Sequence, residues 1–212
     1  MFLDSSALIR QMKVTYNGNG ITFANFQDGL AINAAVWVAW IHNKYVPNKI
    51  KAAVMELSGI LPEEGRMFSV SKQNPNPQYR IDNETVLNAL DRVDNSDKPL
   101  IVTPVCLFEN VDVRLLQDSP NALDSKLLAA NKERLKQPFH GQLHGVNQTY
   151  FSIVDKSQVD YDVESEPTGP CYYTAVQNGV CWYNDICKFM IMPITSKRKD
   201  LMDTLASVKF KE

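Results

Sequence analysis

Three of the four cysteines in this chain of 212 residues lie close together: Cys171, Cys181 and Cys187. Two of the three histidines, His140 and His144, precede them in the same part of the chain. Thiolates and imidazoles are the side chains that hold zinc, and a thiol beside a histidine can act as an activated nucleophile. The segment from residue 140 to residue 187 is therefore where the sequence could carry chemistry.

A zinc site would take its ligands from these same five residues. Structural zinc sites use cysteines two to four residues apart, because a tight turn then aims both thiolates at one ion. The gaps between successive cysteines here are nine and five residues. Glycines follow both His140 and His144, which disfavours the helix that a two-histidine site needs. The spacing therefore argues against zinc, and we expect no metal and no other cofactor.

A cysteine hydrolase would use Cys171 as nucleophile, His140 or His144 as base, and Asp185 as the group that orients the histidine. Such a thiol needs a helix N-terminus or a fixed cation beside it to lower its pKa. The stretch GPCYYTAV, residues 169–176, has the character of a strand instead. Free cysteine is also among the most buried residue types, so packed β-structure is the favoured interpretation and the hydrolase an alternative.

Composition excludes several other classes of protein. The chain has neither a Walker A motif nor a strand–G-x-G-x-x-G–helix unit for a nucleotide. Its net charge of −2 provides no basic stripe, so direct nucleic-acid binding is not expected. The most apolar run, residues 30–41, is shorter than the roughly 20 residues of a membrane span. The first residues lack the features of a signal peptide, which predicts an intracellular protein, in a virion or the host cytoplasm.

A β-hairpin is predicted at residues 13–26. The β-prone triplets 14–16 and 21–23 flank Asn-Gly-Asn-Gly at 17–20, and Asn-Gly supplies the positive φ that tight hairpin turns require.

Two helices are predicted after this hairpin. The first, residues 27–44, rests on apolar residues at three- and four-residue spacing, which indicates one helical face. These residues are Leu30, Ala34, Trp37, Trp40 and Ile41. The second, residues 48–57, lies between Pro47 and Gly59, which are typical of a helix start and a helix end. Together the two helices predict a helical hairpin.

The middle of the chain mixes strands and helices. The predicted elements are a strand at 66–72, a loop at 73–78, a helix capped by Asp82 or Asn83, a strand at 100–108, a helix from Ser119-Pro120 to 136, and irregular chain at 138–148. Pro104 inside the strand at 100–108 cannot donate to a neighbouring strand, so an edge or a bulge is expected there.

The last third has the spacing of an antiparallel β-meander. Its predicted strands are 149–155, 158–164, 171–176, 180–183 and 187–194, with a turn at 177–179. Thr195 or Ser196 then caps a terminal helix, 197–208. The prediction is one α+β domain, 1–212, that is α-rich over 1–137 and β-rich over 148–195 and closes with a terminal helix at 196–208.

The absence of an assembled catalytic motif favours a structural or interaction protein in a larger assembly. Asparagine occurs 17 times, almost twice as often as glycine, which fits an AT-rich genome. The most concrete hypothesis is a viral or tailed-phage particle component, such as a ring, neck or connector subunit, forming a homo-oligomer or hetero-assembly through protein partners. A phage-encoded inhibitor of a host protein is a further alternative. The candidate interface residues are Trp37, Trp40, Tyr172, Tyr173, Trp182, Lys197, Arg198 and Lys199.

Overall fold

The protein is a mixed helix and strand fold, which confirms the predicted α+β class. The computed structural model describes residues 1–80, 84–96, 98–108, 110–118, 142–172, 179–194 and 198–210. Its helices are α1 (Ser5–Asn17), η1 (Asn43–Tyr45), α2 (Asn48–Ser58), α3 (Glu84–Asp94), α5 (Gln148–Phe151), η4 (Lys156–Gln158) and α6 (Lys199–Ala206). None of the described helices combines the length and the apolar character needed to cross a membrane.

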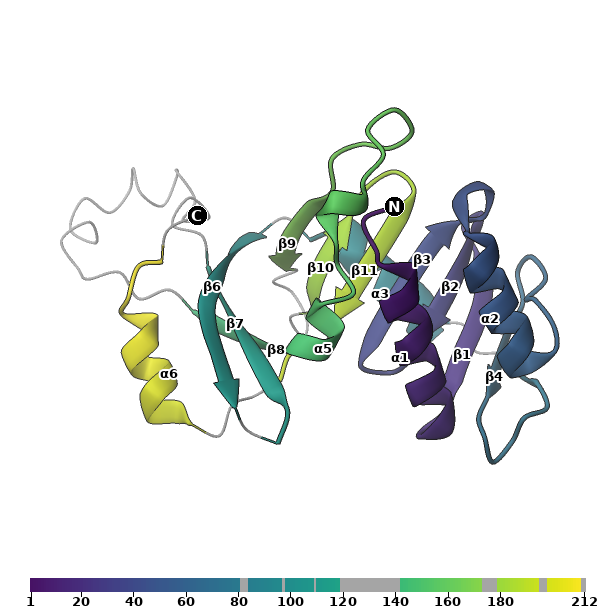
Figure 1. Cartoon of the computed structure of the whole chain (residues 1–212), viewed down its shortest axis with the longest axis horizontal. Coiled ribbons are helices and arrows are strands. Elements are labelled where there is room, and N and C mark those ends of the chain that lie inside the picture. The colour runs from purple at the N-terminus through teal and green to yellow at the C-terminus, as the bar shows by residue number, and fades with distance from the viewer. Residues whose placement is uncertain are drawn as a thin grey trace.

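The described strands form one antiparallel sheet with the order β5-β4-β1-β2-β3-β11-β10-β9-β6-β7-β8 (Figure 1). They are β1 (Ile21–Phe26), β2 (Gly29–Asn33), β3 (Trp37–His42), β4 (Met67–Val70), β5 (Gln78–Tyr79), β6 (Lys98–Phe108), β7 (Asp112–Asp118), β8 (Leu143–Asn147), β9 (Thr168–Tyr172), β10 (Val180–Tyr183) and β11 (Cys187–Ile191). We call β6, β7 and β8 the extension and the other eight strands the main sheet. The two parts join where Lys98 and Pro99 of β6 pair with β9.

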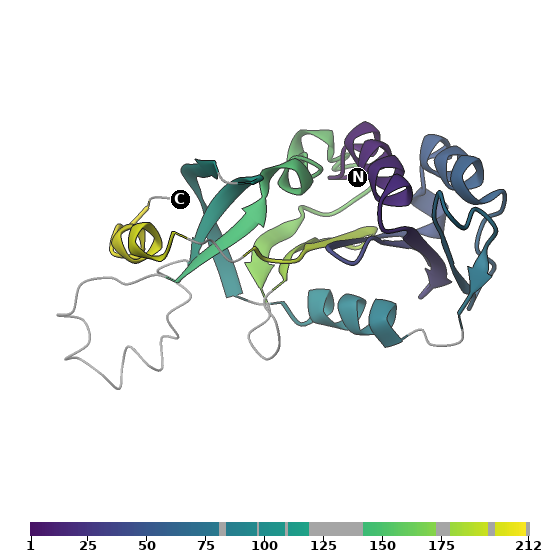
Figure 2. The ribbon, with the colours of Figure 1, turned by 90° about the horizontal axis from the view of Figure 1, so that it is seen from below.

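Helices cover both faces of the main sheet. In Figure 2, α1 and α2 lie on one side and α3 on the other. Leu8 and Met12 of α1 and Val54 of α2 belong to one buried cluster, whereas Val86 and Leu90 of α3 belong to a second. Burying apolar surface from both sides at once is the main stabilisation that this arrangement offers.

The prediction of a helix at 27–44 is wrong, because these residues form β2 and β3. Trp37, Ala39 and Ile41 point to the α1 side, and Val38 and Trp40 point to the α3 side. A strand that is buried on both faces is apolar throughout, so it imitates the apolar spacing of a helix. The predicted helical hairpin is therefore a pair of strands followed by α2.

The prediction of a hairpin at 13–26 is also wrong in its first half. Residues 14–16 are the end of α1, whose first turn is capped by the Asp4 side chain accepting from the backbone N–H of Ser6 and Ala7 at 2.7 and 3.1 Å. Asn17-Gly18 ends this helix and is not a hairpin turn. The hairpin instead joins β1 to β2, and Gln27 and Asp28 supply the positive φ values of 53° and 56°.

Several other predictions are confirmed. Helix α2 ends at Gly59, which has a φ of 76°. Strand β4 forms within 66–72, and the β6–β7 register shifts between Val102 and Cys106, which brackets Pro104 and gives the expected bulge. Strands β9, β10 and β11 are an antiparallel meander, and α6 forms within 197–208.

Helix α3 confirms the helix predicted after residues 82 and 83, and other local predictions fail or lie outside the described residues. The segments 149–155 and 158–164 do not form strands, because α5 occupies the first of them and the second follows η4 as turns, and β8 forms inside the chain expected to be irregular. In the described residues before 119, strands β1 to β7 accompany α1, α2 and α3, so this part of the chain mixes the two kinds of element. The predicted helix 119–136, the turn residues 177 and 178, and the caps at 82, 83, 195 and 196 are outside the described residues.

A side chain of the extension anchors the end of the described chain. Gln117 on β7 is fully buried, donates from Nε2 to the carbonyl of Val208 at 2.7 Å, and accepts from the N–H of Phe210 at 3.2 Å. Leu201 and Leu205 of α6 pack on the same face of the extension. These contacts fix α6 and the segment after it against β7.

Candidate functional site

Cys171 and Cys181 are partners across β9 and β10, on the face that α3 covers. Both are almost completely buried. The Cys171 thiol donates to the carbonyl of Cys181 at 3.4 Å, and the Cys181 thiol donates to the carbonyl of Gly179 at 3.5 Å. Burial raises the pKa of Cys181 to about 12, so its thiol stays protonated at neutral pH.

Cys187 lies on the opposite face of the sheet, in the cluster that α1 covers. Burial raises its pKa well above the ordinary value. The sheet thus separates Cys187 from Cys171 and Cys181, and no disulfide forms between any of the four cysteines. Within the part of the chain that the structure describes, no group of three or more acidic, cysteine or histidine side chains could hold a metal ion.

His144 lies on β8 and is not beside Cys171. Its Nε2 is 2.9 Å from Oδ1 of Asp118, and its ring packs against Tyr172 in a tilted arrangement with 4.7 Å between centroids. Tyr172 follows Cys171 in β9, so their side chains point to opposite faces of the sheet. The predicted nucleophile and this predicted base are therefore on different sides of the sheet.

Asp185 has a different partner as well. It accepts from the Ser165 hydroxyl at 2.7 Å and from the Ser165 N–H at 3.0 Å, and these bonds hold the pKa of Asp185 below its usual range. The other predicted base, His140, is outside the described residues. The described members of the predicted triad do not come together.

The predicted interface rings are core residues. Trp37, Trp40 and Trp182 are buried, and Tyr172 is packed against His144. Their proposed role as surface contacts is a wrong prediction, because each projects from a strand between the sheet and its covering helices. Arg198 and Lys199 are exposed at the start of α6, whereas Tyr173 and Lys197 are outside the described residues.

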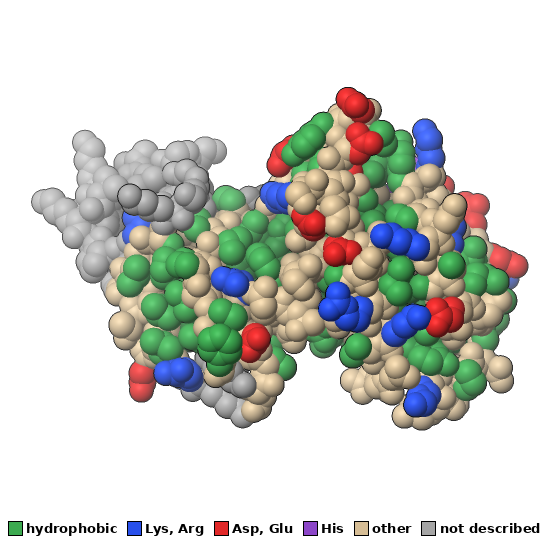
Figure 3. Space-filling view, viewed as in Figure 1, with side chains coloured by type: hydrophobic (Ala, Val, Ile, Leu, Met, Phe, Trp, Pro, Cys, Tyr) green, Lys and Arg blue, Asp and Glu red, His purple; other side chains and the backbone are tan. Residues whose placement is uncertain are grey.

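The extension has one face that its helices leave partly open. By register, Val102, Cys106 and Phe108 of β6 share a face with Asp112 and Arg114 of β7. Figure 3 shows hydrophobic side chains gathered over these strands. Phe108 is 77% exposed, the largest fraction of any large hydrophobic side chain in the described residues, and Val102 is 41% exposed. We call these five residues the open face.

Arg114 is held in place within the open face. Its Nε donates to Oε1 of Gln148 in α5 at 2.7 Å, and its Nη1 donates to the carbonyl of Thr103 at 3.3 Å. The open face therefore carries a cation whose position is fixed by these hydrogen bonds. The opposite face of the extension is covered, since Leu107, Val113 and Leu115 pack beneath α6.

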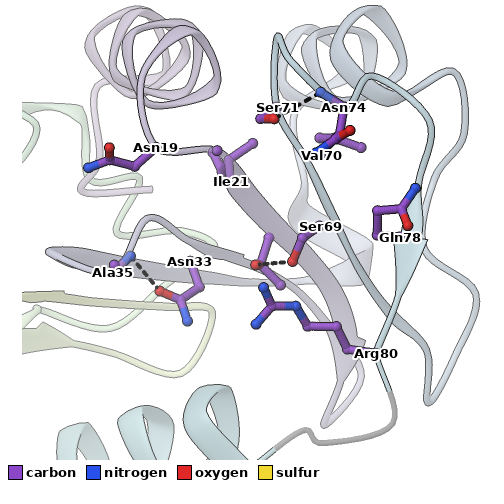
Figure 4. Close-up of a pocket in the computed structure, with 12 residues that line it drawn as sticks. Asn19, Ile21, Asn33, Ala35, Ser69, Val70, Ser71, Asn74, Gln78 and Arg80 are labelled. Atoms are coloured by element: carbon purple, nitrogen blue, oxygen red, sulfur yellow. Dashed lines mark hydrogen bonds between the residues drawn. The ribbon is translucent and has the colours of Figure 1, made fainter.

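A polar pocket of about 370 Å³ lies at the other end of the molecule, beside β1, β2 and β4 (Figure 4). It is lined by Asn19, Gly20, Ile21, Thr22, Asn33, Ala35, Ser69, Val70, Ser71, Asn74, Gln78 and Arg80. Thr22 and Ser69 share a hydrogen bond of 2.7 Å between their hydroxyl oxygens. Asn33 accepts from the N–H of Ala35 at 2.9 Å.

No protein-family model matches the chain, and comparisons with curated proteins and with solved structures find no match. The function therefore has to be argued from the surfaces described above.

Sequence reasoning missed both of these surfaces. Phe108 stood in the strand predicted at 100–108, and the edge or bulge expected from Pro104 did not indicate which face of that strand the helices leave open. The pocket draws on four separate segments, and no local pattern connects them. Its one sequence signal was the density of Asn, Ser and Gln in residues 69–78 with Arg80 behind them.

Proposed function

We propose that the protein is a structural subunit that assembles with further copies of itself through the open face. The observation that carries this proposal is Phe108, an aromatic side chain that is 77% exposed at the end of β6. Aromatic and arginine side chains are enriched at protein interfaces, and covering exposed apolar area contributes about 25 cal/mol per Å².

The charges of the open face support contact between copies. Asp112 and Arg114 flank the apolar residues with opposite signs, so the face is complementary to itself. Such self-complementary faces are what symmetric homo-oligomers use. The asparagine-rich composition supports a particle from an AT-rich genome, and the setting that we propose is a ring, neck or connector of a viral or tailed-phage particle.

Light scattering over a range of concentrations tests the proposal. We expect the unaltered chain to form a defined multimer and Phe108→Ser to shift it towards monomer. Tyr161→Ser is the matched control, because Tyr161 is another exposed aromatic residue, 65% accessible, and lies outside the open face. A strict monomer at high concentration would overturn self-assembly, and a Phe108→Ser variant that assembles normally would overturn the role of the open face.

The hydrolase alternative has no support in the described residues. Its nucleophile, Cys171, is buried, and the sheet separates that side chain from His144. Tight one-to-one binding of a purified host protein, in place of self-assembly, would favour the inhibitor alternative.

A further inference from the structure

The described lining of the polar pocket contains a cation and no carboxylate. Arg80 is the one charged residue among the lining residues that the structure describes. Its guanidinium forms no ion pair with any described side chain. Guanidinium groups pair with carboxylates and phosphates through two parallel N–H donors, so an unpaired one at a pocket selects for an oxyanion.

The base of the pocket offers further donors. Thr22 and Ser69 have two O–H groups between them, and their mutual hydrogen bond uses one, which leaves the other free to donate. Asn33 uses its Oδ1 on Ala35, and its NH₂ group has no partner among the described residues. In Figure 4 the guanidinium of Arg80 extends towards the hydroxyl of Ser69, and Asn33 lies on the neighbouring strand with its oxygen turned towards Ala35.

The rest of the lining can recognise hydroxyl groups. Gln78 donates from Nε2 to the carbonyl of Asn76 at 3.1 Å, which leaves its Oε1 as an acceptor for a ligand. Asn19 and Asn74 add amide groups that can both donate and accept. The lining that the structure describes contains no aromatic ring, so a nucleobase would find no stacking partner there.

We infer that this pocket binds a small polyhydroxylated oxyanion, a sugar acid or a sugar phosphate, with Arg80 on the anionic group. The carboxylate or phosphate sits on Arg80, Asn33 and the free O–H of the Thr22–Ser69 pair. The hydroxyl groups of the ligand face Gln78 and the asparagines. A volume of about 370 Å³ suits one such molecule.

Three probes test the assignment by isothermal titration and by amide chemical shifts of the full chain: glucuronate, glucose 6-phosphate and neutral glucose. We expect saturable binding of at least one anion, with shifts at Gly20 and Asn33, and binding of glucose at least tenfold weaker. Preference for glucuronate assigns a carboxylate, and preference for glucose 6-phosphate assigns a phosphate.

The matched variants are Arg80→Gln and Lys72→Gln. Lys72 is exposed in the neighbouring loop and does not line the pocket, so it controls for the loss of one positive charge. Arg80→Gln should weaken binding about tenfold or more, because it removes charge-assisted hydrogen bonds, and Lys72→Gln should change it less than about twofold. Equal effects of the two variants, glucose binding as tightly as either anion, or no saturation by any probe would overturn the assignment.

Discussion

The main sheet and the extension are made of the same kind of strand but are covered differently. Helices lie on both faces of the main sheet, and all but the last residue of β3 is buried. In the extension α6 covers one face, and exposed and buried residues alternate along much of β6. The comparison shows that covering helices, more than strand composition, decide where this sheet is core and where it is surface.

The largest difference in stability between variants of the main sheet and of the extension is expected when one aromatic side chain in each is replaced by alanine. Trp182→Ala removes a buried ring that contacts Phe151 and Phe189, and should lower the free energy of unfolding by about 3–5 kcal/mol. Phe108→Ala should change it by less than about 0.5 kcal/mol, because that ring is already in water. Urea denaturation measures both, at a concentration where the chain is monomeric. Similar losses would show that Phe108 is packed within the folded chain.

Cysteine thiols should react at different rates in the extension and in the main sheet. Cys106, half-buried on the open face, should react with iodoacetamide at least about a hundredfold faster than Cys171, Cys181 and Cys187. Mass spectrometry of the labelled peptides gives the four rates, and labelling in urea provides the reference in which all four are exposed. Fast labelling of Cys171 in the folded chain would revive the hydrolase alternative.

The tightness of the main sheet can be probed at Gly29. A Cβ at this position would come within 2.2 Å of the Trp40 ring, which is held by its Nε1 donating to the carbonyl of Phe26 at 2.9 Å. Gly29→Ala should therefore cost about 1–3 kcal/mol of stability.

Gly18→Ala is the control for Gly29→Ala, because a Cβ there meets its neighbours at ordinary van der Waals distances of 3.6 Å or more. We expect it to be clearly milder in the same denaturation experiment. Equal costs would mean that the ring of Trp40 moves aside easily, and that the main sheet is looser than its burial indicates.

The smallest expected effect is a loss of folding stability at alkaline pH. The pKa of Cys181 is about 12 in the folded chain against an ordinary value of 9.0, so between these values the unfolded chain loses a proton that the folded chain keeps. The contribution of Cys181 to the free energy of unfolding is fully present below pH 9. Above pH 9 it falls by up to about 1.4 kcal/mol per pH unit. Urea denaturation at pH 8.5 and pH 10 should show a smaller decline for Cys181→Ala, and identical declines would contradict this.

The sequence predicted best those elements whose ends carry their own signals. Pro47 and Gly59 bound α2, and Pro104 marked the bulge in β6, because these effects depend on backbone geometry at one residue. Strand β3 was missed since burial on both faces erases the period of two. Val14 and Thr15 are β-prone by propensity, yet the cap at Asp4 and the buried face of α1 keep them helical.

The site could be predicted even less well. The spacing of the cysteines disfavoured a metal site because ligand geometry is a local property, but it did not show that Cys187 lies on the face opposite Cys171 and Cys181. The partners of His144 and Asp185 depend on strand order, as does the pocket, whose lining comes from residues 19–22, 33–35, 69–74 and 78–80. Contacts of this kind form only when segments distant in the sequence come together, and the amino-acid composition does not indicate which segments do so.

The Gln117 side chain acts as a one-residue strand. Its amide presents a donor and an acceptor to Val208 and Phe210 in the way that a neighbouring backbone would. Because the Gln117 amide contacts only main-chain atoms, its two hydrogen bonds do not depend on the side chains at positions 208 and 210. The surface of that segment is thus free to diversify, and to meet new partners, while its attachment to β7 stays the same.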